Sequence, residues 1–299
     1  MLRSIILTLL AASAVSPAIA NPQHEAWNRA RTPFPIIGNT WYVGTQGLSM
    51  LLIRGKQGAV LIDAGLPKSA ANLRDSLAAL DVAPTEIKLI LTSHAHVDHV
   101  GALAELKALT GARVLASPDS ASLLAAGGKG DLHFGDSMTY SPVVVDGTIV
   151  DGQTVTLGEL VFTAHLTPGH TPGSTSWSWE ERDGERTLAI VYADSITAPG
   201  YRLLDHPKLP RLVDDYRRTF AQLRAMPCDV LITPHPDASD LFARVEQGLH
   251  KNAQSKQGAM PLDAGLIDSR ACMRYADRAG QALDAQITQQ RAELHAAAL

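Results

Sequence analysis

The stretch KLILTSHAHVDH, residues 88–99, joins an apolar run to a dense group of polar side chains. The run 88–92 has the pattern of a buried strand, and an amphipathic helix is predicted from about Val100, so the polar group lies on a strand-to-helix loop. His94 and His96 are two residues apart in extended chain and can point the same way, whereas Asp98 and His99 follow the turn. The spacing predicts two adjacent metal sites.

The density of imidazole and carboxylate groups is the reason to expect a metal. Four of the six residues from His94 to His99 are histidine or aspartate. Burying such groups without partners costs free energy, and a metal ion is a common partner for them. Imidazole and carboxylate ligands without a thiolate are typical of hydrolytic zinc centres. The alternative is a polar loop without a ligand.

Two further histidines follow strand-like runs. His170 lies in LTPGHTPGS, residues 166–174, and His235 lies in TPHP, residues 233–236. The prolines and glycines around them favour rigid turns that can present a ligand. Either residue alone would be an ordinary loop histidine, but with the group at 94–99 they complete two sets of three ligands. Three protein ligands per metal leave coordination positions open for catalysis.

Outward from this group, short strand-like runs alternate with helical patterns. The strand-like runs are 49–53, 59–62, 88–92, 113–116, 160–166, 174–179, 188–192 and 229–233. The helical patterns are 68–80, 100–109, 117–126 and 212–226. This alternation predicts a layered α/β architecture. We expect a long surface loop at 127–150 and an outer helix within 266–299.

Composition limits the organisation of the chain and its partners. With 299 residues, 45% of them apolar, the chain can bury a large core. No linker of low complexity divides it, so we expect one domain over residues 21–299. The 26 Lys and Arg residues are outnumbered by 30 Asp and Glu residues, and a nucleic acid partner is therefore not expected. We expect a monomer that acts on a small molecule.

Residues 1–20 have the pattern of a secretory signal. Arg3 precedes a mostly apolar run, and AIA at 18–20 supplies the small residues that flank a cleavage point. Pro17 interrupts the run, which falls short of the roughly 20 apolar residues that a membrane span needs. We therefore expect cleavage near Ala20, export to the periplasm and no membrane anchor.

Cys228 and Cys272 are the two cysteines of the chain. They are too few for a zinc site built from thiolates. In an oxidising compartment they could form one disulfide, and two buried free thiols are the alternative.

The HAHVDH segment at 94–99 resembles the signature of the metallo-β-lactamase superfamily. The fold of that superfamily is a four-layer αβ/βα sandwich with zinc between two sheets. Later segments resemble β-lactamases of class B, subclass 3: DLHFGD at 131–136, HTPGS at 170–174, YADS at 192–195, APGY at 198–201, DYRR at 215–218 and PCDVL at 227–231. The resemblance extends over roughly residues 27–275.

The resemblance implies two zinc ions per chain, each on three ligands. One zinc is expected on His94, His96 and His170, and the other on Asp98, His99 and His235. A zinc-bound hydroxide would attack the lactam carbonyl, and Asp98 would act as the catalytic carboxylate.

The resemblance also assigns substrate contacts and a disulfide. The hydroxyls of Ser195 and Thr197 would contact the substrate carboxylate, and Tyr201 would lie near the carbonyl. Trp27 and Phe134 match positions that wall the cleft. Cys228 and Cys272 match the disulfide of the subclass. The other six histidines are expected to be structural or surface residues: His24, His133, His165, His206, His250 and His295.

The expected activity is hydrolysis of penicillins, cephalosporins and carbapenems, which confers antibiotic resistance. One alternative is a lactonase or thioester hydrolase of the same superfamily, in which Asp194 bridges both metals. A zinc carrier without catalysis is a second alternative. Serine catalysis is disfavoured because the sequence has no Ser-x-x-Lys or Gly-x-Ser-x-Gly motif.

Overall fold

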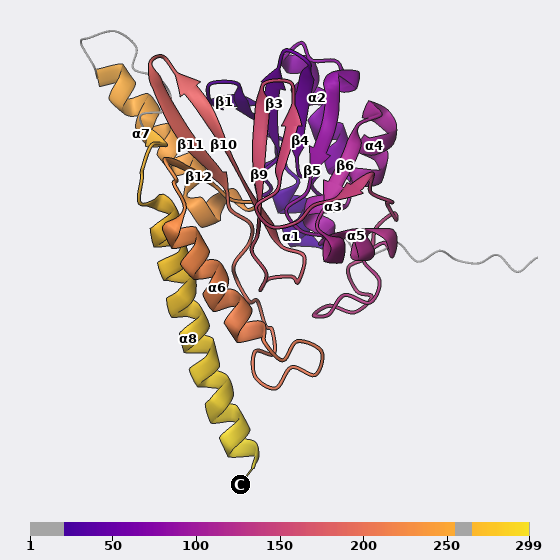
Figure 1. Cartoon of the computed structure of the whole chain (residues 1–299), viewed down its shortest axis with the longest axis vertical. Coiled ribbons are helices and arrows are strands. Elements are labelled where there is room, and N and C mark those ends of the chain that lie inside the picture. The colour runs from indigo at the N-terminus through magenta and orange to yellow at the C-terminus, as the bar shows by residue number, and fades with distance from the viewer. Residues whose placement is uncertain (1–20, 255–264, 299) are drawn as a thin grey trace, which may run out of the picture.

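The computed structural model describes residues 21–254 and 265–298 of the chain (Figure 1). The predicted signal segment, residues 1–20, lies outside these ranges. Two sheets stack face to face, and helices cover the outer face of each.

The first sheet contains seven strands in the order β1-β2-β3-β4-β5-β6-β7. Their bounds are β1 Phe34–Ile37, β2 Thr40–Tyr42, β3 Leu51–Gly55, β4 Gly58–Ile62, β5 Ile87–Leu91, β6 Arg113–Ala116 and β7 Gly147–Thr148. Strands β1 to β4 pair antiparallel, and β4 to β7 pair parallel. The parallel strands therefore end at one edge, where β5 leads into the histidine-rich segment.

The second sheet contains five strands in the order β12-β11-β10-β9-β8. Their bounds are β8 Thr154–Leu157, β9 Leu160–Leu166, β10 Thr175–Asp183, β11 Arg186–Tyr192 and β12 Val230–Ile232. Strands β8 to β11 pair antiparallel, and β12 joins β11 in parallel. The loop between β9 and β10 carries His170, and β12 leads to His235.

Alternation along the strands separates two apolar layers. In β3, Leu51 and Ile53 belong to the core between the sheets, which also contains Trp177 of β10. Leu52 belongs instead to the core beneath the helices of the first sheet, with Leu103. This period of two is what a strand covered on both faces requires.

The helices form the two outer layers of the sandwich. Helices α2 (Ser69–Ala79), α4 (Leu103–Thr110) and α5 (Pro118–Ala125) cover the first sheet, and α6 (Leu212–Ala225) and α8 (Ala271–Ala297) lie together along the second (Figure 1). The shorter α1 (Pro22–Trp27) and α3 (Val97–Val100) lie near the histidine-rich segment. Helix α7 (Leu241–Gln254) comes after β12 in the chain. The predicted four-layer αβ/βα sandwich is confirmed.

Each predicted strand and helix has a counterpart, with one notable difference. The helix predicted from about Val100 is two helices, because α3 begins inside the motif at Val97 and α4 begins only at Leu103. Gly111 ends α4 with a φ of 68°, in the left-handed region that favours glycine. Strands β1, β2, β7 and β8 and helices α1 and α7 were not predicted. Within the described ranges, no helix is long and apolar enough to span a membrane.

A disulfide links the second sheet to its outer helix. Cys228 lies just before β12, Cys272 lies in the first turn of α8, and their sulfur atoms are bonded. This confirms the pairing that the resemblance implied.

Candidate metal centre

Three histidines from two loops form the first ligand set. His94 and His96 follow β5, and His170 lies between β9 and β10. Their ligand atoms lie within 4.8 Å of one another, and all three side chains are buried. The ring centroids of His94 and His170 are 4.7 Å apart. The structure therefore brings together the first predicted set.

The second set surrounds the carboxylate of Asp98. One oxygen, Oδ2, lies 3.3 Å from Nε2 of His99 and 3.3 Å from Nε2 of His235. Asp98 and His99 belong to the single turn of α3, whereas His235 follows β12. His94, Asp98 and His99 also lie within 4.8 Å of one another, so the two sets are adjacent.

Buried ring nitrogens that form no hydrogen bond indicate whether these residues fit a metal. Nε2 of His94, Nε2 of His96 and both ring nitrogens of His99 are buried and form no hydrogen bond among the described residues, although His96 Nε2 lies 3.4 Å from Asp131 Oδ2 and His99 Nε2 lies 3.3 Å from Asp98 Oδ2. Each such atom costs about 1–3 kcal/mol unless a partner compensates for its lost hydration. The donors are nitrogen and carboxylate oxygen, with sulfur absent, which suits zinc in a hydrolytic site. The residues present therefore fit the metal.

Contacts behind the rings fix which nitrogen of each histidine is left free to bind a metal. Nδ1 of His170 lies 2.8 Å from the carbonyl oxygen of Thr197, and Nδ1 of His235 lies 3.1 Å from that of Gly47. A carbonyl oxygen only accepts, so each Nδ1 carries the proton and Nε2 is left with its lone pair. His94 Nδ1 donates in the same way to Asp194 Oδ1 at 2.7 Å.

Burial and charge set the protonation of the ligands. Burial lowers the pKa of His94 and of His170 well below the usual range, which keeps both imidazoles neutral. Burial acts to raise the pKa of Asp98, but the neighbouring His99 charge holds it well below its usual range. Burial acts to lower the pKa of His99, yet Asp98 raises it to about 9. A proton and a metal ion therefore compete for the second set.

Asp63 is a supporting residue that sequence reasoning missed. Its buried carboxylate accepts from the backbone N–H of Ser93 at 2.7 Å, from the Ser93 hydroxyl at 2.7 Å and from the Tyr192 hydroxyl at 2.8 Å. Asp63 therefore ties the ends of β4, β5 and β11 together, and its Oδ2 lies 3.8 Å from Nδ1 of His99. An aspartate immediately after a predicted strand was the available signal.

A cavity of about 370 Å³ opens above the ligands. Trp27 packs against the His235 ring with centroids 4.8 Å apart, and Phe134 packs against His96 at 5.1 Å. Both aromatic residues wall the cavity, as the resemblance implied. The full lining is Asn21, Gln23, His24, Trp27, His96, Val97, Asp98, Phe134, Met138, His170, Ser195, Thr197, Pro199 and His235. None of these described residues is Lys or Arg.

Of the three residues predicted to contact substrate, two line the cavity and one does not. Ser195 and Thr197 line the cavity, as expected of residues that contact a substrate. Tyr201 does not line it: the side chain is buried, stacks on His133 with centroids 3.5 Å apart and lies behind His170.

Two further residues differ from their expected settings. His24 lines the cavity rather than serving the structural or surface role that we expected, because α1 folds over the site. Asp194 lies behind His94, outside both ligand sets found among the described residues.

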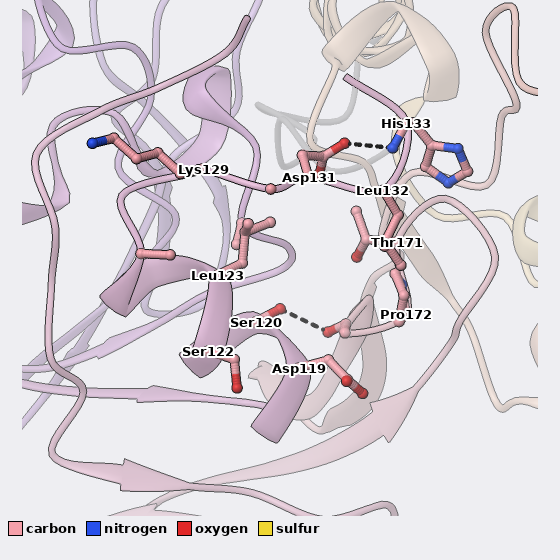
Figure 2. Close-up of a pocket in the computed structure, with 14 residues that line it drawn as sticks. Asp119, Ser120, Ser122, Leu123, Lys129, Asp131, Leu132, His133, Thr171 and Pro172 are labelled. Atoms are coloured by element: carbon pink, nitrogen blue, oxygen red, sulfur yellow. Dashed lines mark hydrogen bonds between the residues drawn. The ribbon is translucent and has the colours of Figure 1, made fainter. Parts of the chain in front are cut away.

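A second cavity, of about 240 Å³, flanks the metal loops without exposing a ligand histidine. Figure 2 shows it between α5, which carries Ser120 and Leu123, and the segments that carry Asp131 and Pro172. Ser120 donates to the carbonyl oxygen of Gly173 at 3.0 Å, so α5 anchors the loop that presents His170. The contacts around this cavity support the ligand loops from outside.

The chain is similar in sequence to a family of known proteins. The family model described as Metallo-beta-lactamase superfamily matches residues 43–184. A hydroxyacylglutathione hydrolase of Methylobacterium nodulans is 36% identical over 196 residues, which is 60% of this chain and 65% of that protein. The corresponding protein of Anaeromyxobacter dehalogenans is 34% identical over 139 residues, 46% of this chain and 44% of that protein. The chain thus spans roughly half the length of several curated relatives.

Solved structures match over almost their whole length. Rm3 metallo-beta-lactamase is 40% identical with a TM-score of 0.83, covering 91% of this chain and 99% of that one. BJP-1, a subclass B3 metallo-beta-lactamase of Bradyrhizobium japonicum, is 35% identical with a TM-score of 0.80, covering 90% of this chain and 99% of that one. Sequence and fold agree along the length of these matches, and the chain belongs to the metallo-β-lactamase superfamily.

Proposed function

We propose that this protein hydrolyses the amide bond of β-lactams and holds two zinc ions, one on each ligand set. The observation that carries the proposal is the chemistry of the cavity wall. Ser195 and Thr197 offer hydroxyls beside the ligands, Trp27 and Phe134 contribute aromatic walls, and none of the described lining residues is Lys or Arg. Such a wall suits a compact, largely apolar ligand with a single carboxylate.

The curated relatives suggest a second candidate, hydrolysis of glutathione thioesters. A glutathione conjugate carries two carboxylates, and recognition of carboxylates commonly uses Arg or Lys. The lining of the described cavity offers neither. The two hydroxyls of Ser195 and Thr197 could hold the single carboxylate of a β-lactam but leave two carboxylates without a cation, which favours β-lactams over thioesters.

The placement of Asp194 also disfavours the thioesterase or lactonase alternative. In that alternative Asp194 would bridge the metals. Its Oδ1 accepts from His94 Nδ1, on the side of the ring away from Nε2. An aspartate that orients a ligand from behind is not placed to bridge two ions. Ser195, the next residue, faces the cavity instead.

The chain's own residues would bind, orient and protonate the substrate. Zinc bound to the two sets would supply a Lewis acid that polarises the lactam carbonyl and acidifies water. The Ser195 and Thr197 hydroxyls would hold the substrate carboxylate and thereby place the carbonyl over the ligands. Asp98, ionised because of its lowered pKa, would accept a proton from water and return it to the leaving nitrogen.

We propose further that residues 1–20 direct export to the periplasm and that residues 21–299 form one domain. The disulfide between Cys228 and Cys272 supports export, because such bonds persist in oxidising compartments. We expect carbapenems to be among the substrates and the protein to confer antibiotic resistance.

Parallel assays of the zinc-loaded protein test the proposed function. The substrates are a chromogenic cephalosporin, a carbapenem, a glutathione thioester and an acyl-homoserine lactone. We expect turnover of the cephalosporin and the carbapenem, loss of that turnover with a chelator and recovery with zinc. Turnover of the thioester or the lactone alone would overturn the proposal. It would favour the alternative in which Asp194 bridges the metals.

A further inference from the structure

Helix α6 lies behind two loops of the site at once. One loop presents His170, and the other carries Ser195 and Thr197. Tyr216, on the buried face of α6, donates its hydroxyl to the carbonyl oxygen of Thr197 at 2.8 Å. The helix therefore contacts the backbone of the loop that is proposed to bind substrate.

The same carbonyl oxygen also holds His170. Nδ1 of His170 lies 2.8 Å from it, so the Thr197 oxygen accepts two hydrogen bonds, one from Tyr216 and one from the ligand. A carbonyl oxygen has two lone pairs, and both are used here. The Tyr216 hydroxyl thus restrains the atom that sets the orientation of the His170 ring.

The Tyr216 ring supports the His170 loop from a second direction. A Cβ added to Gly169 would lie 2.7 Å from the Tyr216 ring, so the backbone immediately before His170 rests against this side chain. One turn further along α6, Thr219 donates to the carbonyl oxygen of Pro168 at 2.7 Å. Burial raises the pKa of Tyr216 far above its usual value, which keeps the hydroxyl protonated and able to donate.

We propose that Tyr216 is a positioning residue whose hydroxyl, through the carbonyl oxygen of Thr197, couples the orientation of the ligand His170 to the position of the Thr197 side chain. Loss of this hydroxyl should weaken metal binding and substrate binding together. The inference rests on the proposed ligand role of His170 and, for substrate, on the proposed role of Thr197.

The test compares Tyr216→Phe with Thr219→Val. The first variant keeps the ring against Gly169 and removes only the bond to Thr197. The second removes the hydrogen bond from α6 to Pro168 in the His170 loop and leaves the contacts of Thr197 unchanged. Zinc per chain and zinc affinity are measured by competition with a chelator, beside the melting temperature of each variant. We expect Tyr216→Phe to bind zinc about 10- to 100-fold more weakly, and Thr219→Val to lose melting temperature but keep the zinc affinity of the wild type.

Substrate kinetics distinguish a loss of positioning from a general loss of stability. For Tyr216→Phe we expect KM to rise for a β-lactam acid but not for its methyl ester, which lacks the carboxylate. Wild-type zinc affinity in Tyr216→Phe, or equal zinc loss in Thr219→Val, would overturn the inference. If the wild type fails to hydrolyse β-lactams, the proposed function fails while the zinc measurements still decide the role of Tyr216.

Discussion

The proposed ligand residues are oriented by atoms that belong to other parts of the chain. His94, His170 and His235 each donate through Nδ1, to Asp194, Thr197 and Gly47 respectively. Fixing Nδ1 as the donor leaves Nε2 unprotonated, which is the form that a metal requires. The chemistry of each ligand thus depends on one residue that binds no metal.

Asp98 is the residue whose charge the proposed mechanism needs most. Asp98→Asn removes the carboxylate that lies 3.3 Å from both His99 and His235, so we expect kcat to fall by about 10²-fold or more while the fold is kept. Steady-state kinetics and circular dichroism measure the two effects. Asp119→Asn, an exposed site on the flanking cavity, serves as the control. A fully active Asp98→Asn enzyme would contradict the proposed role of the Asp98 carboxylate.

The two ligand sets should differ in their response to pH. Without metal, the charge of Asp98 outweighs burial and raises the pKa of His99 to about 9, so zinc must displace a proton from the second set. Zinc affinity there should therefore fall as pH drops from about 8 to about 6, by up to tenfold per unit. In the first set, burial keeps His94 and His170 neutral in this range, so these two ligands should add no such dependence on pH. Calorimetric zinc titrations at several pH values measure both, and two pH-independent sites would refute the prediction.

At the scale of elements, the site is assembled where strands end. The loops after β5, β9 and β12 bring the ligand histidines to one edge of the two stacked sheets. The segment between β2 and β3 closes the same edge, since Gly47 donates to the carbonyl oxygen of Trp27 at 2.9 Å and accepts from His235. Helix α1 is thereby held over the cavity.

Gly47 leaves no room for a side chain between α1 and this loop. A Cβ there would lie 2.3 Å from the Trp27 ring, so Gly47→Ala must displace either Trp27 or the carbonyl that orients His235. We expect kcat/KM and zinc affinity each to fall about tenfold. Gly280→Ala in α8 is the matched control: its nearest neighbour would be 3.4 Å away, and it should leave activity unchanged. Wild-type zinc affinity in Gly47→Ala would show that this packing does not position His235.

At the scale of the whole molecule, the disulfide joins the last helix to the second sheet. Cys228 and Cys272 are 44 residues apart, and both lie in the apolar layer between that sheet and helices α6 and α8. Helix α8 also supports the site, because the Tyr275 hydroxyl donates to the carbonyl oxygen of Asp194 at 3.2 Å. The outer helix is therefore part of the framework of the metal centre.

Removing the disulfide should lower stability more than activity. For Cys272→Ala we expect the free energy of unfolding to fall by about 2–4 kcal/mol, because the unfolded chain gains freedom. Urea unfolding measures the change, and chemical reduction of the wild type should reproduce it. Unchanged stability in both experiments would contradict a structural role for this bond.

The layered fold and the grouping of the candidate ligands were predictable because their signals are local. The run before Ser93 is a buried strand within five residues, and four potential ligands follow within six more, so their shared loop could be inferred directly. The start of α3 inside the motif could not be inferred, since a single helical turn has too few residues to show a period. For the same reason the short strands β2 and β7 were missed.

Patterns along the chain were enough to identify the residues that could bind metal, eight of the strands and the cysteines that could pair. Tertiary contacts were needed to show that Asp194 supports His94 across 100 residues of sequence, that Gly47 supports His235 across 188, and that Tyr201 is buried behind the candidate ligands. The physical reason is that periodicity and motif spacing report on neighbours along the chain. The orientation of a ligand ring depends instead on groups that meet only when the two sheets stack.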